Sequence, residues 1–150
     1  MKRLAVLAAA AAAVVIGMGG TASAASGPNS VTLRQTNPTG RTTVVSVGVI
    51  NATGRDVVLS DTEDKFVYPE GNIFVTHTPT SFEDHSKPGK CIFDNEEEGT
   101  YVVTGGTGDY RGAEGQGKYE AHITATGCGK TPKTFLLVVH ASGTLDIDNN

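Results

Sequence analysis

The four histidines of this chain are the side chains best suited to acid–base or metal chemistry near neutral pH. They are His77, His85, His122 and His140. His77 shares one face of an expected strand with Ile73 and Val75, so its imidazole is expected to point into the protein. That position makes His77 the candidate for proton transfer with a bound molecule. The alternative for each strand histidine is a structural role with one satisfied hydrogen bond, and His85 is expected to be solvated in a loop.

No sequence motif supports a metal site or a serine nucleophile. The histidines lack the H-E-x-x-H pattern and any other close ligand spacing, and no serine lies in a G-x-S-x-G elbow. Two acidic runs, Asp94 with 96–98 and Asp146 with Asp148, lack the D-x-[DN]-x-[DN]-G pattern of a calcium loop. We therefore expect no metal and no cofactor, and we interpret the runs as a solvated turn and a polar tail.

A glycine-rich stretch, YVVTGGTGDYRGAEGQGKYEAH at 101–122, suggests either a phosphate-binding loop or the corner of an all-β fold. A dinucleotide fingerprint would need its third glycine at Arg111, and no long helix follows the stretch. Glycines also supply the positive φ angles and close backbone approaches of tight corners. The stretch therefore predicts a corner, with Tyr110 turned inward to close one end of a barrel.

The elements that must position these residues are short strands. Apolar or alternating runs separated by Gly, Pro, Asn and Asp continue to the C-terminus, and no long segment after residue 24 has helical periodicity. Residues 118–125 alternate cleanly, and 133–145 are apolar on both faces, as in a central strand. Residues 79–90 contain no apolar run and predict the longest loop. The count of eight or nine strands favours a β-barrel or a β-sandwich.

The first residues have the pattern of a secretory signal peptide. Lys2 and Arg3 precede a thirteen-residue apolar run at 4–16, and Ala22-Ser23-Ala24 fits the A-x-A cleavage rule. We place the signal peptide at 1–24 and a single domain at 25–150. A membrane anchor is the alternative, but the run is shorter than the roughly 20 residues that span a bilayer. We expect a secreted, extracellular protein that is not membrane-embedded, and the short Ala-rich signal is typical of bacteria.

Charge and cysteine content agree with an extracellular domain. Removing Lys2 and Arg3 changes the formal charge from −4 to −6, which does not suit nucleic acid or an anionic membrane surface. Cys91 and Cys128 are the only cysteines, and an even count in an exported protein predicts a disulfide. Two free thiols are the alternative, whereas a zinc site would need more ligands at closer spacing.

The glycine stretch resembles the G-G-T-G-x-[FY]-x-x-A-x-G signature of the allene oxide cyclase and dirigent superfamily. The matching residues are Gly105, Gly106, Thr107, Gly108, Tyr110, Ala113 and Gly115. The clear match covers about 25 residues, from Gly99 to Ile123. The resemblance implies a closed, eight-stranded antiparallel β-barrel of calycin type with a largely apolar cavity and no cofactor. Members of the family can be oligomeric, so a homo-oligomer is compatible with the resemblance. The signature consists of turn and packing residues, so it carries no catalytic position to this chain.

The barrel interior is the expected binding site. The large residues available to line or fill it are Phe66, Phe74, Phe93, Tyr101 and Phe135. The first function hypothesis is a secreted, non-catalytic protein that binds a small apolar ligand in the barrel. The second is a cofactor-independent cyclase or isomerase for a hydrophobic substrate, in which a buried polar residue such as His77 moves a proton. The third is a structural extracellular protein with a filled barrel. A cavity containing an ionisable residue would favour the second hypothesis, and a filled core the third.

Overall fold

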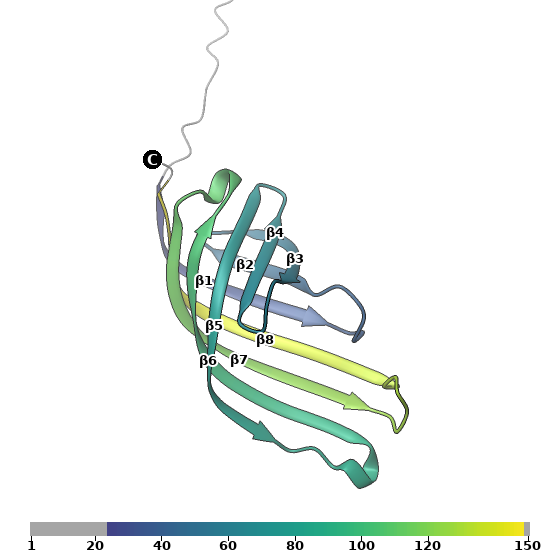
Figure 1. Cartoon of the computed structure of the whole chain (residues 1–150). Helices are drawn as coiled ribbons and strands as arrows, with labels where there is room; N and C mark the ends of the chain where they lie inside the picture. Colours follow the sequence, from purple (N-terminus) through teal and green to yellow (C-terminus); the bar gives the residue numbers. More distant parts are fainter. Residues whose placement is uncertain (1–23, 149–150) are drawn as a thin grey trace, which may run out of the picture.

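The computed structural model describes residues 24–148, and eight antiparallel strands in it close into one barrel (Figure 1). The strands are β1 (Ala25–Gln35), β2 (Thr43–Gly48), β3 (Ala52–Val58), β4 (Glu63–Tyr68), β5 (Gly71–Asp84), β6 (Ile92–Gly106), β7 (Ala113–Thr126) and β8 (Thr134–Ile147). Each strand pairs with the next in sequence, and β8 pairs with β1. The predicted all-β, closed, eight-stranded antiparallel barrel is confirmed. The predicted signal peptide lies, apart from Ala24, outside the described residues.

Alternation along each strand selects the inner face of the barrel. In β2, Val44 and Ser46 are buried while Val45 and Val47 are exposed. Because successive side chains of a strand point to opposite faces, the chain buries alternate residues and leaves the others to solvent. No helix among residues 24–148 has the length and apolar character needed to cross a membrane.

The strands differ in length, and this difference shapes the molecule. β2, β3 and β4 have 6 or 7 residues, whereas β5 to β8 have 14 or 15. The distal parts of β5 to β8, which we call the strand extension, therefore continue as a curved sheet beyond the short strands (Figure 1). The strand extension comprises residues 79–84, 92–98, 120–126 and 134–140.

Two segments expected to be irregular belong to this extension. Residues 79–84 end β5 instead of forming a loop, and 94–99 lie within β6 instead of forming a turn. Pro79 is tolerated because the β5–β6 register shifts between Pro79 and Ser81, and a bulge accommodates a residue that cannot donate a ladder hydrogen bond. Polar sequence misleads here because strand pairing satisfies the backbone while the side chains of 79–84 remain exposed to solvent. Asp146 also lies in a strand, β8, and not in a tail.

The glycine-rich stretch forms a barrel corner around the single-turn helix η2 (Gly108–Tyr110). Gly108 and Gly112 have φ angles of 63° and 73°, which side-chain-bearing residues rarely adopt. Tyr110 is buried, and its ring meets the edge of Tyr68 with ring centroids 5.8 Å apart. Its hydroxyl donates to Glu70 Oε2 at 3.2 Å. The stretch thus turns the chain from β6 into β7 with the Tyr110 side chain buried.

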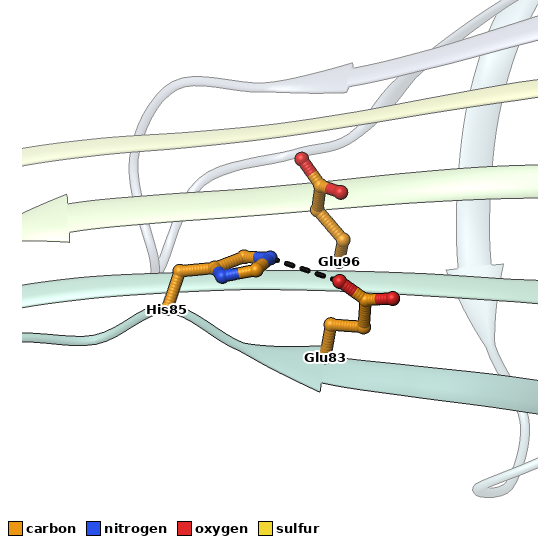
Figure 2. Close-up of side chains that lie close together, drawn as sticks. All are labelled: Glu83, His85 and Glu96. Carbon is orange, nitrogen blue, oxygen red and sulfur yellow. Dashed lines mark ion pairs between the residues drawn. The ribbon is translucent and has the colours of Figure 1, made fainter.

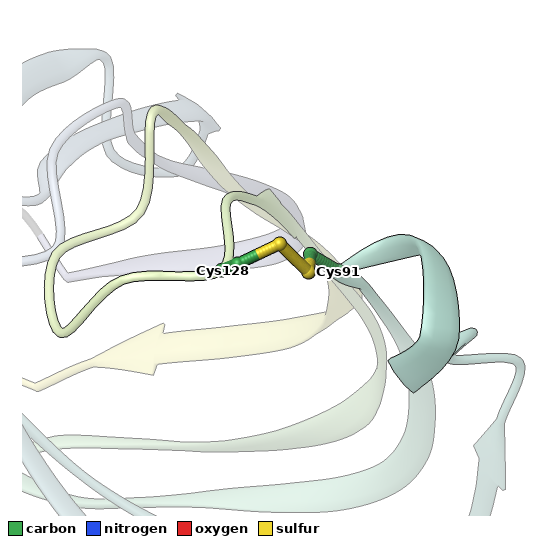
Figure 3. Close-up of a disulfide and its surroundings, with 2 residues drawn as sticks. All are labelled: Cys91 and Cys128. Atoms are coloured by element: carbon green, nitrogen blue, oxygen red, sulfur yellow. A yellow bond between two sulfur atoms is a disulfide. The ribbon is translucent and has the colours of Figure 1, made fainter.

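The sulfur atoms of Cys91 and Cys128 lie at disulfide-bonding distance, as predicted, and the two Cα atoms are 5.0 Å apart (Figure 3). Cys91 follows the second single-turn helix, η1 (Pro88–Lys90), between β5 and β6, whereas Cys128 lies between β7 and β8. The bond thus ties together the two connections at the far end of the strand extension.

Candidate functional site

The two ends of the barrel are packed differently. Near the Tyr110 corner, inward side chains leave a void of only about 20 Å³. The buried residues that fill this end include Ile50, Tyr68, Ile73, Val103 and Leu145. Toward the strand extension, the inward side chains leave a cavity of about 220 Å³. The barrel is therefore filled at one end and hollow at the other.

Most of the cavity wall is apolar. The apolar lining comes mainly from β1, β7 and β8: Val31, Leu33, Ala121, Ile123, Leu137, Val139 and Ala141. The opposite side, from β4, β5 and β6 together with one residue of β7, carries the titratable groups Asp64, His77, Glu97, Tyr101 and Tyr119. A molecule in this cavity would thus have an apolar surface on one side and polar groups on the other.

Two tyrosine–glycine pairs set the position of the aromatic rings. Tyr119 on β7 faces Gly99 on β6, and two residues further along Tyr101 faces Gly117. A Cβ added to Gly117 would lie 2.6 Å from Tyr101 Cε1, and one added to Gly99 would lie 2.5 Å from Tyr119 Cζ. Glycine at both positions therefore lets each ring lie flat across the neighbouring strand.

The polar groups of the cavity form two pairs that meet at an aromatic contact. His77 Nε2 lies 3.4 Å from Asp64 Oδ2, and the Tyr119 hydroxyl donates to Glu97 Oε1 at 2.7 Å. The rings of His77 and Tyr119 are in edge-to-face contact with centroids 5.7 Å apart. His77 Nδ1 is buried and has no hydrogen-bond partner among the described residues. The structure thus brings an imidazole, a phenol and two carboxyl groups to one side of the cavity.

Burial changes the protonation of these groups. It raises the pKa of Asp64 from its ordinary value, and the nearby His77 opposes part of that rise. Burial, followed by the hydrogen bond to Glu97 and the charge of that carboxylate, raises the pKa of Tyr119 well above its usual value. Burial alone raises the pKa of Tyr101. Both tyrosines consequently keep their hydroxyl protons at neutral pH.

Asp56 on β3 is a further acid that reasoning from the sequence did not identify. Its Oδ1 is buried without a hydrogen-bond partner in residues 24–148. Burial, with a smaller contribution from the charge of Asp64, raises the pKa of Asp56 to about 7. Asp56 pairs across the strands with Phe66, so it stands next to the cavity wall without lining the cavity.

The five aromatic residues predicted to line the interior occupy different places. Phe66 and Tyr101 line the cavity. Phe93 and Phe135 lie beyond it in the strand extension, each opposite Ala125 of β7, and Phe93 is 46 % exposed. Phe74 does not line the cavity because it points to the opposite face of β5 from the buried Val75.

The predicted candidate His77 does lie at the cavity, but its partners were not identified from the sequence. Asp64 precedes Phe66 by two residues, so the two-residue period of a strand would have placed it on the same inner face. Glu97 was hidden because its segment was interpreted as a turn. His122 and His140 lie on the outer face, with Asp94 2.8 Å from His122 Nε2 and Thr32 3.4 Å from His140 Nδ1.

Comparison of the chain with protein-family models, with curated proteins and with solved structures gave no significant match.

Proposed function

We propose that this protein is a secreted barrel that binds one small, largely apolar molecule in its cavity. The observation that carries the proposal is the cavity of about 220 Å³, which has an apolar wall and a titratable side. A cavity of about 150 Å³ in another protein holds benzene, and sites for drug-sized ligands are about 300–1,000 Å³. The expected ligand is therefore somewhat larger than benzene and smaller than most drugs.

The polar side of the cavity favours a neutral ligand that donates a hydrogen bond. Asp64 and Glu97 offer carboxyl oxygens, and Tyr119 already uses its proton on Glu97. Two carboxyl groups would repel an anionic ligand, whereas a hydroxyl group could donate to either of them. Small alicyclic alcohols and phenols have this combination of an apolar body and one donor.

We also propose that the protein is a remote relative of the allene oxide cyclase and dirigent superfamily, and the corner motif supports this. In the structure the motif residues Gly105 to Gly115 form a corner of an eight-stranded barrel, which is the architecture that the resemblance implies. The leader pattern at 1–24 and the cysteine pair at disulfide distance support export.

The binding proposal is tested by filling the cavity. The full chain is titrated with phenol and with cyclohexanol by isothermal calorimetry, alongside Ala121→Phe and the matched control Val102→Phe. Ala121 lines the cavity, whereas Val102 is exposed on the outer face, so only the first substitution removes binding volume. We expect saturable binding by the wild type and by Val102→Phe, and its loss in Ala121→Phe. Absence of binding by the wild type, or equal binding by Ala121→Phe, would contradict the proposal.

A second function, cofactor-independent isomerisation or cyclisation, is favoured by the Asp64–His77 pair. If the imidazole Nε2–H faces Asp64, Nδ1 is left as a base. A proton would pass from a substrate carbon to Nδ1 and return at a different carbon of the same molecule, so the isomerisation needs no external reactant. The ring must rotate slightly to present Nδ1 to the cavity, because that atom is buried.

The catalytic alternative is tested with a carbon acid as probe. Exchange of the α-hydrogens of cyclohexanone in D₂O is followed by NMR with the wild type, His77→Gln and His140→Gln. We expect the wild type and His140→Gln to accelerate the exchange and His77→Gln to lose the acceleration, by about 10²-fold or more. If the wild type binds apolar alcohols but does not accelerate the exchange, the catalytic alternative is wrong and the protein is a non-catalytic binding protein.

A further inference from the structure

The outer face of the strand extension gathers side chains that can bind a metal ion, away from the cavity. Glu83, His85 and Glu96 each offer one ligand atom, and these three atoms lie within 4.8 Å of one another. Figure 2 shows that the His85 ring and the Glu83 carboxylate point toward each other from the same edge, with Glu96 projecting from the neighbouring strand. We call these three residues the Glu–His–Glu cluster.

Strand register explains why the cluster forms. Glu83 on β5 pairs directly with Glu96 on β6. The ladder continues past the end of β5, since the His85 backbone N–H donates to the Asp94 carbonyl at 2.8 Å. Residues two apart on a strand share a face, so Glu83 and His85 project to the same side as Glu96. The positions of the three side chains are therefore fixed by backbone pairing.

A second histidine stands on the other side of Glu96. His122 on β7 pairs across the strands with Glu96, and its Nε2 lies 4.0 Å from Glu96 Oε1. The same nitrogen lies 2.8 Å from Asp94 Oδ1. Glu96 thus has one imidazole on each side, His122 on β7 and His85 just after the end of β5.

The charges around the cluster call for a cation. Glu83 and Glu96 are directly opposite each other, and like charges at such positions destabilise a sheet. Within residues 24–148, the ion pairs of these carboxylates are made by His85 and His122 and not by lysine or arginine. A divalent cation bound between the strands would place two positive charges beside both carboxylates and so offset this repulsion.

We propose that the Glu–His–Glu cluster binds a divalent transition-metal ion, with zinc as the type case. An imidazole nitrogen together with carboxylate oxygens suits zinc, which accepts mixed nitrogen and oxygen ligands with little geometric demand. Calcium and magnesium prefer oxygen ligands alone and gain little from His85. The three ligand atoms now lie within 4.8 Å of one another and need to approach by about an ångström to surround a zinc ion at zinc–ligand distances of about 2.0–2.2 Å. The three side chains are exposed, so they have room for this movement.

The disulfide restrains the strand ends that carry the cluster. The Cys91–Cys128 bond links the β5–β6 connection, which begins at His85, to the β7–β8 connection (Figure 3). The strand ends that carry the ligands are therefore restrained before a metal binds, which lowers the entropy lost on binding. The bond also removes the two thiols of the chain as competing zinc ligands.

The test is a titration of the full, untagged chain with zinc chloride by calorimetry under non-reducing conditions. The variants are His85→Ala, Glu96→Gln and the control His140→Ala, which removes an exposed histidine from the same outer face without touching the cluster. We expect one zinc ion per chain for the wild type and His140→Ala, and an affinity at least about tenfold lower for His85→Ala and Glu96→Gln. Long-range imidazole NMR should show the His85 nitrogen shifts moving with zinc.

Four results would overturn the proposal. They are the absence of saturable zinc binding, unchanged affinity in His85→Ala, an equal loss in His140→Ala, and calcium binding as tight as zinc binding. Circular dichroism of each variant checks that the barrel is intact, which we expect because the substituted side chains are exposed. The result is independent of ligand binding in the barrel, since none of the cluster residues lines the cavity.

Discussion

Asp56 carries a buried oxygen without a hydrogen-bond partner among the described residues, and this makes stability depend on pH. Its pKa rises from 3.8 to about 7, chiefly through burial. Below about pH 4 the carboxyl is protonated in both the folded and the unfolded chain. As pH rises toward 7 the unfolded chain loses this proton first, so the folded state binds more protons. The free energy of unfolding should therefore fall across this range and level off above it.

The substitution Asp56→Asn should remove much of this pH dependence. Between pH 4 and pH 8 the wild type should lose roughly 2 kcal/mol more free energy of unfolding than Asp56→Asn. This is about half of what the whole pKa shift of Asp56 would give, because the side chain is partly exposed and solvent screens it. Urea unfolding at pH 4, 6 and 8 measures it, with the exposed Asp61→Asn as control. Parallel pH profiles for the wild type and Asp56→Asn would contradict the assignment.

The contribution of the Tyr119–Glu97 hydrogen bond to stability can be measured by replacing Tyr119 with Phe and comparing the same replacement at Tyr101. The Tyr119 hydroxyl donates to Glu97, whereas the Tyr101 hydroxyl has no partner within residues 24–148. Tyr119→Phe should lower the free energy of unfolding by about 1.5–3 kcal/mol, as expected for a hydrogen bond to a charged group. Tyr101→Phe should change it by less than about 0.5 kcal/mol. Equal effects in urea unfolding at pH 7 would show that the Tyr119–Glu97 bond contributes nothing.

At the scale of the element, glycine on β6 sets the position of the ring on β7. A Cβ at Gly99 would collide with the Tyr119 ring and lie 2.5 Å from the Thr78 carbonyl oxygen. Gly99→Ala should therefore displace the ring and lower the free energy of unfolding by about 1–3 kcal/mol. Gly89→Ala is the matched control, since nothing lies within 4 Å of its added Cβ. Thermal unfolding compares the two, and a neutral Gly99→Ala would mean that the ring is free to move aside.

The sequence predicted the elements better than their lengths. Alternation in 118–125 identified the inner face of β7, and the corner glycines identified the turn before it. The polar segments 79–84 and 94–99 were misinterpreted as a loop and a turn because strand residues exposed to solvent have the polar composition of a loop, whereas 85–90 do connect β5 to β6. That error concealed Glu97 in the cavity. It also concealed the Glu–His–Glu cluster, whose members are brought together only by the β5–β6 register.

The disulfide should matter more to the strand extension than to the closed barrel. Cys91 and Cys128 tie the distal connections, whereas the β1–β8 pairing that closes the barrel is independent of them. In the Cys91→Ala/Cys128→Ala variant we expect faster amide exchange in 82–98 and 120–136. Protection near Val44 and Leu145 should persist, because both residues are buried in the filled end. Uniformly faster exchange across the chain would instead mean that the bond stabilises the whole barrel.

At the scale of the whole molecule, the filled end provides stability and the hollow end provides space. Ile147 is 4 % exposed at the filled end and pairs with Ala25 on β1 and Ala113 on β7. Ala121 lines the cavity on β7. A small side chain at Ala121 leaves volume unfilled, while large side chains at the other end complete the core. Stability and binding should therefore respond to different substitutions.

Ile147→Ala tests this division. Removing buried methyl groups should lower the free energy of unfolding by about 2–4 kcal/mol, through lost burial and the void left behind. The affinity for phenol or cyclohexanol should change by less than about threefold under conditions where the variant is folded, because Ile147 does not line the cavity. Ala121→Phe should show the reverse, with binding lost and the free energy of unfolding changed by less than that of Ile147→Ala, since the new ring enters existing space. Urea unfolding and calorimetry on the same samples measure both quantities. Parallel losses of stability and affinity in Ile147→Ala would show that the two ends act as one packed unit.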